Sequence, residues 1–364
     1  MVDFVPQVAL QGFNTLALPA RAEYFCTAAS IDELHKALDF ARQRALDVTV
    51  LGGGSNIIFA GDVAGLVIRL AISGIAKVGE EDEEGERVLV RVGAGENWHQ
   101  LVLHCLHQQW YGLENLSLIP GCAGAAPIQN IGAYGVELAQ RFVSLEAIDL
   151  DSGNIITLDR AACRFGYRDS VFKHELRGRV AITSITLALS RRAEPQLDYP
   201  ELRNALSDIP QPTPLQVSAT VCALRRAKLP DPVERPNAGS FFKNPVIPVS
   251  QAQQLKASHP DLPLYPVSEQ ATKIPAAWLI DRAGWKGVRR GPVGVHDRQA
   301  LVLVHFGGGS GAELLQLAAD IADDVARRFG VTLELEPAVI GGASAAGEGH
   351  SLVGRGQPDA GSGL

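Results

Sequence analysis

The sequence contains no closely spaced cysteine pair. Its five cysteines are odd in number and scattered along 364 residues, at Cys26, Cys105, Cys122, Cys163 and Cys222. Zinc and redox motifs need C-x-x-C or a similar spacing, and a disulfide framework needs an even set. The pattern argues against both kinds of site and indicates a reducing compartment.

Long apolar runs and net positive charge are also absent. No stretch reaches the roughly 18 apolar residues of a membrane span, and residues 1–15 lack the basic start of a signal peptide. A formal net charge of −7 argues against a binder of nucleic acid or membrane surfaces, which needs basic surface. We therefore predict a cytoplasmic protein with no nucleic-acid and no membrane partner.

What is present is an ordinary globular composition, with 46% hydrophobic and 20% charged residues. The length allows two or three domains. Helices are predicted at 30–46, where Ser30 and Glu33 form a capping-box pair, and at 97–109, 250–257 and from Pro275 onward. A further helix is predicted at 311–329, capped by Ser310 and Glu313, with one apolar stripe formed by Leu314, Leu317, Ile321 and Val325.

Strands are predicted between these helices, and together they indicate an α+β body with mixed or antiparallel sheets. They are expected at 47–51, 57–60, 65–70, 87–95, 143–150, 154–158 and 180–189, with a final strand in 331–342 that returns to an earlier sheet. The acidic segment 80–86 is predicted to be an exposed hairpin. The Gly- and Ser-rich tail, 342–364, is predicted to be disordered.

Two glycine-rich loops are the first candidates for a binding site. "LGGGSN" (51–56) ends a predicted strand, and its backbone N–H groups with Ser55 and Asn56 are suited to an anion such as a diphosphate. It is neither a G-x-G-x-x-G motif nor a Walker A loop, and a plain tight turn is an equal alternative. "PGCAGAAPIQNIGAYG" (120–135) has more small residues than a turn needs, which favours close approach of backbone to a ligand. The two loops together suit a large dinucleotide held between two lobes.

Two further segments carry candidate reactive side chains. "CRFGYRDSVFK" (163–173) contains Arg168, whose guanidinium can grip a substrate carboxylate; a structural pair with Asp169 is the alternative. "AGSFFKNP" (238–245) sets the hydroxyl of Ser240 against two phenylalanines. It is not a G-x-S-x-G elbow, which argues against a Ser-His-Asp hydrolase. His99, His104 and His107 lack the spacing and third ligand of a metal site.

Taken together, these segments resemble the UDP-N-acetylenolpyruvoylglucosamine reductase (UDP-N-acetylmuramate dehydrogenase, MurB) family. The matching stretches run in order through nearly the whole chain except its tail. They are "LGGGSN", "VGAGENWH", "GLENLSLIPGCAGAAPIQNIGAYGVEL", "CRFGYRDSVFKHE", "KLPDP", "NAGSFFKNP" and "AAWLIDRAGWKG". "QLDYPEL", with Tyr199, is similar to the tyrosine loop of the family's longer type.

The resemblance implies two FAD-binding lobes of the vanillyl-alcohol-oxidase/PCMH type and a third α+β substrate-binding domain. We expect residues 1–78 with 330–341 in the first lobe, 79–229 in the second and 230–329 in the third domain. It also implies the activity: NADPH reduces FAD, and the enolpyruvyl group of the UDP-sugar then takes a hydride at C3 and a proton at C2. This step belongs to peptidoglycan precursor synthesis, and so to cell-wall biogenesis, cell shape and cell division.

The resemblance further assigns three catalytic residues. Arg168 is expected to hold the substrate carboxylate, and Ser240 to donate the proton to C2 from a buried position opposite the cofactor. The third position is a glutamate in the last strand, where relatives read L-E-P-E-V and this chain reads "LELEPAVIG". An ungapped match favours Glu336. Glu334, on the same strand face, is the fallback, and aligning the "LEP" letters would place Ala338 there and leave the role vacant.

Binding residues carry over by the same motifs. The UDP-sugar site is expected to include Tyr199, Arg225, Lys228, Asn244, Tyr265 and Gln299. Contacts to FAD are expected from Gly52, Gly53, Gly54, Ser55, Asn56, Gly121, Cys122, Gly124, Ala125, Gln129, Asn130, Gly132, Ala133, Tyr134 and Gly135. Neither loop offers a histidine for covalent attachment, so we expect non-covalent FAD, no metal, NADPH as co-substrate and a monomer. An FAD-dependent sugar or alcohol oxidase and a non-catalytic nucleotide-binding module are the alternatives.

Overall fold

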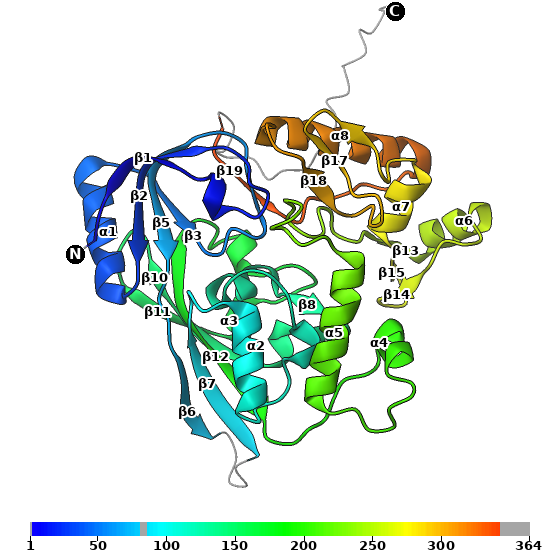
Figure 1. The fold of residues 1–364 in the computed structure, drawn as a ribbon, viewed down its shortest axis with the longest axis horizontal. Helices are drawn as coiled ribbons and strands as arrows, with labels where there is room; N and C mark the ends of the chain where they lie inside the picture. The colour runs from blue at the N-terminus through cyan, green and yellow to red at the C-terminus, as the bar shows by residue number, and fades with distance from the viewer. Residues whose placement is uncertain (1, 81–85, 343–364) are drawn as a thin grey trace, which may run out of the picture.

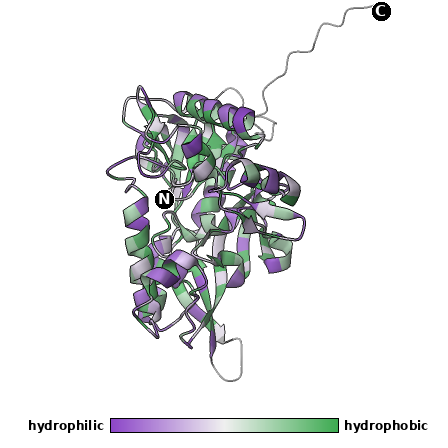
Figure 2. Ribbon diagram, turned by 90° about the vertical axis from the view of Figure 1, so that its right-hand side faces the viewer, coloured by the Kyte–Doolittle hydropathy of each residue, from purple (hydrophilic) through white to green (hydrophobic). Residues whose placement is uncertain are grey.

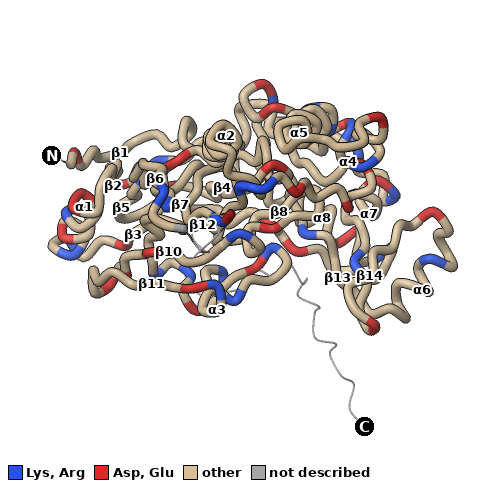
Figure 3. The backbone as a smooth tube through the Cα atoms, turned by 90° about the horizontal axis from the view of Figure 1, so that it is seen from below, with Lys and Arg blue, Asp and Glu red and all other residues tan. Residues whose placement is uncertain are grey.

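The computed structural model describes residues 2–80 and 86–342, and its chain forms three groups of sheets and helices (Figure 1). The predicted acidic hairpin falls mostly within 81–85, and all but the first residue of the predicted disordered tail lies in 343–364. Both therefore lie outside the described residues. No helix in the described part of the chain is long and apolar enough to cross a membrane. Positive and negative residues are interspersed along the chain (Figure 3).

The first sheet contains the strand that leads into the first glycine loop. Its order is β1 (Val5–Ala9), β2 (Arg21–Ala28), β5 (Val63–Leu70) and β3 (Val48–Leu51). The pair β1–β2 is antiparallel, and β2–β5 and β3–β5 are parallel. Helix α1 (Ile31–Arg44) covers it and buries an apolar stripe that includes Leu34 and Leu38.

The predicted N-terminus of α1 is confirmed, with one difference in the cap. Ser30 accepts a hydrogen bond from the Glu33 backbone N–H. The Glu33 carboxylate accepts from the Ala29 N–H instead of the Ser30 N–H. Both bonds still satisfy backbone donors at the helix start, which stabilises the helix end.

The second sheet is wholly antiparallel. Its order is β11 (Ile155–Asp159), β10 (Phe142–Asp149), β12 (Val180–Ser190), β7 (Arg87–Gly93) and β6 (Ile75–Glu80). Because β6 starts at Ile75, it spans the expected boundary at 78/79. Helix α2 (Trp98–His107) packs on this lobe, with Trp98, Leu101 and Val102 buried.

The small-residue run, 120–135, follows α2 on this lobe. It contains the 3₁₀ helix η3 (Ala123–Gln129) and leads into the short hairpin β8 (Gly132–Ala133)–β9 (Val136–Glu137). Shorter elements complete the lobe: η2 (Glu114–Leu116), η4 (Leu138–Gln140), α3 (Arg160–Cys163) and η5 (Val171–Lys173). Helices α4 (Pro200–Ala205) and α5 (Pro214–Lys228) follow β12.

The third group is built from two small antiparallel sheets and three helices. The sheets are β13 (Val246–Pro248)–β15 (Ala271–Lys273)–β14 (Tyr265–Pro266) and β16 (Arg289–Arg290)–β17 (Val293–Val295)–β18 (Leu303–His305). The helices are α6 (Val249–Ser258), α7 (Ala276–Arg282) and α8 (Gly311–Phe329). The predicted capping box of Ser310 and Glu313 at the start of α8 is confirmed. Figure 2 shows hydrophilic and hydrophobic residues interleaved on the outer helices, as expected where one face is buried.

The C-terminal segment joins the third group to the first lobe. The predicted final strand is confirmed only as β19 (Ala338–Ile340), which pairs in parallel with β4 (Ile57–Phe59). Before it, the Lys243 N–H donates to Glu334 O at 2.9 Å, and the Glu336 N–H donates to Phe241 O at 3.0 Å. Pro337 has no N–H and cannot donate a further hydrogen bond to the loop at 241–243. After it, the segment bonds to the first lobe instead, with the Ala338 N–H donating to Asn56 O. The strand therefore passes the Ser240 loop before it reaches the first lobe.

Candidate active site

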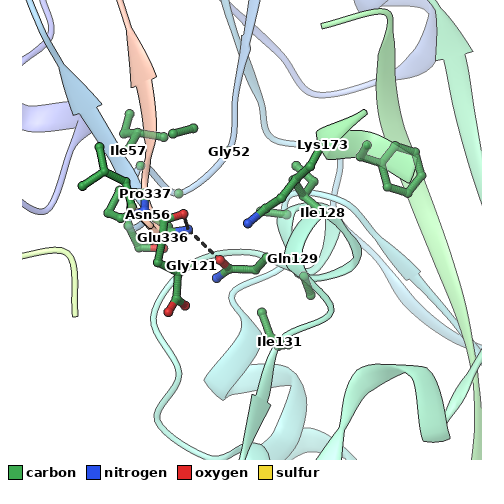
Figure 4. Close-up of a pocket in the computed structure, with 18 of the residues that line it drawn as sticks. Gly52, Asn56, Ile57, Gly121, Ile128, Gln129, Ile131, Lys173, Glu336 and Pro337 are labelled. Carbon is green, nitrogen blue, oxygen red and sulfur yellow. Dashed lines mark hydrogen bonds between the residues drawn. The ribbon is translucent and has the colours of Figure 1, made fainter. Parts of the chain in front are cut away.

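A cavity of about 750 Å³ lies where the two glycine-rich loops and the C-terminal segment meet (Figure 4). Its size is in the range of ligand sites in enzymes. Its walls come from residues 50–57, from residues between 119 and 131, from residues 169–177 of the loop after α3, and from Lys243 and residues 332–339.

Glycine is required in the first loop for two different reasons. A Cβ on Gly53 would lie 2.9 Å from Gly121 Cα, and a Cβ on Gly52 would lie 2.6 Å from the Cys122 sulfur. Gly54 has φ +62°, and a Cβ there would lie 2.0 Å from Phe13 O. Gly54 thus serves the tight turn that was one alternative, whereas Gly52 and Gly53 let the two loops approach closely.

The side chains of Ser55 and Asn56 tie the loops together. The Ser55 hydroxyl donates to Pro120 O at 3.1 Å. The Asn56 amide donates to Gln129 Oε1 at 2.7 Å and to Glu336 O at 3.3 Å (Figure 4). These hydrogen bonds brace the cavity walls, and the role of Ser55 and Asn56 as donors to an anion stays a prediction.

The structure separates the expected cofactor-binding residues into two groups. Nine of them line the cavity: Gly52, Gly53, Gly54, Ser55, Asn56, Gly121, Cys122, Ala125 and Gln129. The other six are not among its lining residues: Gly124, Asn130, Gly132, Ala133, Tyr134 and Gly135.

Each part of the second group has other neighbours. A Cβ on Gly124 would lie 2.5 Å from Ala94 Cβ, so Gly124 packs on the second sheet. The buried Asn130 side chain bonds to Glu137, Gly166 and Ala139. The 132–135 hairpin instead faces Arg168 and Tyr199, on the side where the substrate is expected.

Arg168 is the centre of a charged cluster beside the cavity. Its Nη2 donates to Gly132 O at 2.6 Å, and its Nε lies 3.4 Å from Glu336 Oε1. Asp169 contacts His174 instead, with 2.8 Å between Oδ2 and Nε2. The alternative of an Arg168–Asp169 structural pair is therefore wrong.

The two candidate glutamates occupy different environments. The Glu336 side chain is 12% exposed, whereas that of Glu334 is 66% exposed and pairs with Lys243 Nζ at 3.0 Å. Burial raises the pKa of Glu336, against the opposing charges of Arg168, Lys173 and Lys243. Of the two glutamates only Glu336 is buried beside Arg168, and its catalytic role stays a prediction.

Ser240 lies next to the Glu336 segment, but its surroundings differ from those predicted. It is half-buried, and its hydroxyl has no hydrogen-bond partner among the described residues. Phe241 and Phe242 are fully buried in the core of the third group. They anchor the loop, with the Phe241 N–H donating to Leu301 O and its carbonyl accepting from Glu336. The aromatic pair therefore positions Ser240 rather than enclosing it.

Three of the expected UDP-sugar residues come together. The Tyr199 ring packs edge-on against Tyr134, with centroids 5.2 Å apart. Burial raises the pKa of the Tyr199 phenol. The nearby Lys228 ammonium lowers this pKa, and Tyr265 raises it. Lys228 forms an ion pair with Glu201, and its side chain is 46% exposed.

The other three expected UDP-sugar residues, Arg225, Asn244 and Gln299, differ in their hydrogen bonds to the rest of the protein. Arg225 has a buried Nε without a hydrogen-bond partner in the described chain, and burial lowers its pKa. Asn244 Oδ1 accepts from the Ala276 N–H at 2.9 Å and so caps α7. Gln299 Oε1 accepts from the Leu301 N–H at 3.4 Å, in the loop that bonds Phe241.

Sequence reasoning missed two lysines that line the cavity, Lys173 and Lys243. Lys173 Nζ donates to Arg168 O at 3.0 Å, and burial, with a smaller effect of Lys243, lowers its pKa to about 8. A lone lysine in a loop carries no sequence signal for burial. Its position after the Arg168 motif was the only clue available.

Comparison with known proteins agrees with this architecture. A family model described as an FAD binding domain matches residues 22–159, and one described as the C-terminal domain of UDP-N-acetylenolpyruvoylglucosamine reductase matches residues 231–340. The Chromobacterium violaceum reductase of that name is 47% identical over 93% of this chain and 99% of its own length. The Pseudomonas aeruginosa reductase is 49% identical over 90% of this chain and 96% of its own length.

The fold is shared with a solved structure. The crystal structure of the Thermus caldophilus reductase (MurB) matches with a TM-score of 0.65 and 24% identity, over 94% of this chain and all of that chain. Together with the FAD-binding model, this confirms the predicted α+β, FAD-binding fold with a third domain. By its identity to curated relatives over nearly its whole length, the chain belongs to the UDP-N-acetylenolpyruvoylglucosamine reductase family.

Proposed function

We propose that this protein reduces the enolpyruvyl group of UDP-N-acetylglucosamine enolpyruvate to give UDP-N-acetylmuramate, with NADPH as reductant. Family membership makes it an FAD-dependent oxidoreductase. The observation that carries the proposal is the contact of Arg168 with Glu336, which lines the glycine-walled cavity and whose N–H bonds to the Ser240 loop at Phe241 O. The reaction would serve peptidoglycan precursor synthesis in the cytoplasm.

The cavity fits the cofactor that the family uses. The close approach of Gly53 to Gly121 leaves backbone, without side chains, along two walls, and such walls suit a long dinucleotide. Non-covalent FAD would be held by these walls, with Asn56 and Gln129 bracing them. FAD held there would supply the two-electron redox chemistry that connects NADPH with C3 of the substrate.

The residues around the cavity would stabilise negative charge on the substrate and donate one proton to it. Arg168 would bind the substrate carboxylate, into which the negative charge that develops at C2 delocalises. The Ser240 hydroxyl would donate its proton to C2, completing addition across the double bond. Tyr199, Lys228 and Tyr265 would bind the UDP moiety, with the Lys228 ammonium at the diphosphate.

The non-catalytic alternative depended on an empty third catalytic position. The position of Glu336, 3.4 Å from Arg168, supports a glutamate in that role and so favours the catalytic proposal. The oxidase alternative makes a different prediction, since an oxidase passes electrons to oxygen rather than to an enolpyruvyl group. Its test is therefore the same experiment as the test of the proposal.

Recovery of flavin absorbance tests the function directly. Under anaerobic conditions NADPH should bleach the yellow protein, and adding UDP-N-acetylglucosamine enolpyruvate should restore the absorbance stoichiometrically. UDP-N-acetylglucosamine, which lacks the enolpyruvyl group, is the control and should restore nothing. A flavin that stays reduced with the enolpyruvyl substrate and reoxidises rapidly only in air would reject the proposal in favour of the oxidase.

Substitution of Gly53 should weaken FAD binding. In Gly53→Ala the new methyl group must displace the backbone of Gly121, and overpacking of this kind costs about 1–3 kcal/mol. If that cost falls on the bound state, the Kd for FAD rises about 5-fold to 150-fold. The measurement is FAD titration of the apoprotein by quenching of flavin fluorescence. Gly12→Ala, whose Cβ meets nothing within 4 Å, is the control, and equal affinities for the two variants would contradict the close-approach argument.

A further inference from the structure

Lys173 reaches the charged cluster from inside the cavity. It is the last residue of η5, and its side chain points into the cavity on the side facing Asn56 and Glu336 (Figure 4). Its Nζ donates to the main-chain carbonyl of Arg168 at 3.0 Å. Lys173 thus contacts both the expected cofactor space and the backbone of the residue expected to hold the substrate.

The backbone of Arg168 needs such support. Residues Gly166 to Asp169 form a tight turn closed by two backbone hydrogen bonds of 3.0 and 3.3 Å between its ends. Arg168 is the third residue of this turn and has φ +54°, a left-handed conformation that turns usually assign to Gly or Asn. A non-glycine residue held there is strained and persists only when its surroundings fix it.

Three contacts of Arg168 provide that fixation, and they act on different parts of the residue. Gly132 O and Glu336 hold the guanidinium. Lys173 holds the carbonyl, and so fixes the peptide that follows the left-handed residue. Loss of the Lys173 contact would leave the guanidinium partners and the two hydrogen bonds of the turn in place, but it would release the Arg168 carbonyl and so loosen the left-handed residue that aims the side chain.

Burial of the charged Lys173 ammonium costs free energy, so its position needs a physical explanation. Burial and the neighbouring Lys243 and Arg168 disfavour its ammonium form, while Glu336 and Asp169 favour it. A purely structural donor to one carbonyl does not require an ammonium in such a site. The position is explained if the cavity fills with an anionic cofactor and the lysine links that occupancy to the Arg168 turn.

We propose that Lys173 is a positioning residue of the reaction: it locks the left-handed Arg168 turn and thereby holds the guanidinium where the substrate carboxylate binds. The inference rests on the proposed function, because it assigns Lys173 an action only through Arg168. Its consequence is specific. Loss of Lys173 should impair carboxylate binding and the second half-reaction, but only while Arg168 is present.

A double-mutant cycle on the FAD-loaded protein tests this inference. Product affinity is measured as the Kd for UDP-N-acetylmuramate, from the change in flavin absorbance on titration. Lys173→Met should weaken product binding about 10-fold when Arg168 is present and less than about twofold in an Arg168→Met background, since contacting residues couple and independent ones add. Lys243→Met is the matched control, because it removes a second cavity cation that has no hydrogen bond to Arg168.

Rates provide a second readout. Lys173→Met should slow the substrate-driven return of flavin absorbance by about 10-fold to 100-fold, because misplacement of a binding group by about 1 Å can cost that much. Reduction of the flavin by NADPH should change less than about threefold. Should Lys173→Met fail to retain FAD, Lys173→Gln, which keeps an N–H donor, enters the same cycle.

The outcomes separate the inference from the proposed function. Equal effects of the Lys173 substitution with and without Arg168, or an effect of Lys243→Met as large as that of Lys173→Met, would overturn the positioning role. If the wild-type protein binds no UDP-N-acetylmuramate and its reduced flavin does not respond to the enolpyruvyl substrate, the proposed function itself fails.

Discussion

Ser240→Ala is expected to slow the return of flavin absorbance by about 10²–10⁴-fold, the usual effect of removing a positioned general acid. The half-reaction with NADPH should keep nearly its wild-type rate, because it transfers no proton to substrate carbon. The two rates are measured separately by anaerobic stopped-flow mixing. The split between them is the informative result, since general damage to the fold would lower both.

A matched serine provides the control for this prediction. Ser250, at the start of α6, is exposed. Ser250→Ala should leave both rates within about twofold of wild type, because most surface substitutions change the stability of a protein little. Loss of FAD from Ser240→Ala would point to a structural role for the loop. Full-speed flavin recovery in Ser240→Ala would remove Ser240 from the mechanism and require another proton donor.

The fold was largely predictable because its elements carry strong local signals. The α1 and α8 caps and the apolar stripe of α8 occur where the pattern places them, because caps and 3.6-residue periodicity depend on nearby residues. The last strand was overestimated for the same reason. Its alternation continues through 331–336, but the partner of that stretch is the loop at 241–243 and not a sheet, and pairing across about 90 residues leaves no local trace.

The site was less predictable from the sequence, and the Ser240 loop shows why. The sequence pattern favours the two phenylalanines as a dry surround for the hydroxyl, yet both are buried in the core of the third group. Burial of neighbours along a loop says nothing about which way each side chain points. The glycine loops were easier to predict, because the three glycines at 52–54 are visible in the sequence and the structure has no room for a Cβ at these positions.

The pairing of Arg168 illustrates the same limit. Asp169 is its neighbour in sequence, and a structural pair between the two is the alternative that the sequence allows. The left-handed turn at Arg168 sends the two side chains to different partners, Glu336 and His174. A positive φ at a non-glycine residue is set by the surrounding structure, so no sequence pattern predicts it.

The last prediction decides between the two glutamates of the C-terminal segment. Glu336→Gln should slow flavin recovery by about 10²–10⁴-fold if Glu336 takes part in the proton transfer, while Glu334→Gln should change it by less than about threefold. The two substitutions are isosteric and lie two residues apart. Among the described residues the Glu334 side chain, 66% exposed, pairs only with Lys243, and a pair with a solvent-exposed partner contributes about 0–1 kcal/mol.

The expected ionisation of Glu336 sharpens that comparison. Burial already raises the pKa of Glu336, and a substrate carboxylate bound at Arg168 would raise it further, because like charges disfavour each other's ionised forms. With Glu336 acting as an acid, the wild-type rate of flavin recovery should fall as the pH rises through this raised pKa. Glutamine cannot titrate, so the remaining activity of Glu336→Gln should lose that limb of the profile, whereas Glu334→Gln should keep it. A profile unchanged in Glu336→Gln, or a larger loss in Glu334→Gln, would move the third catalytic role away from Glu336.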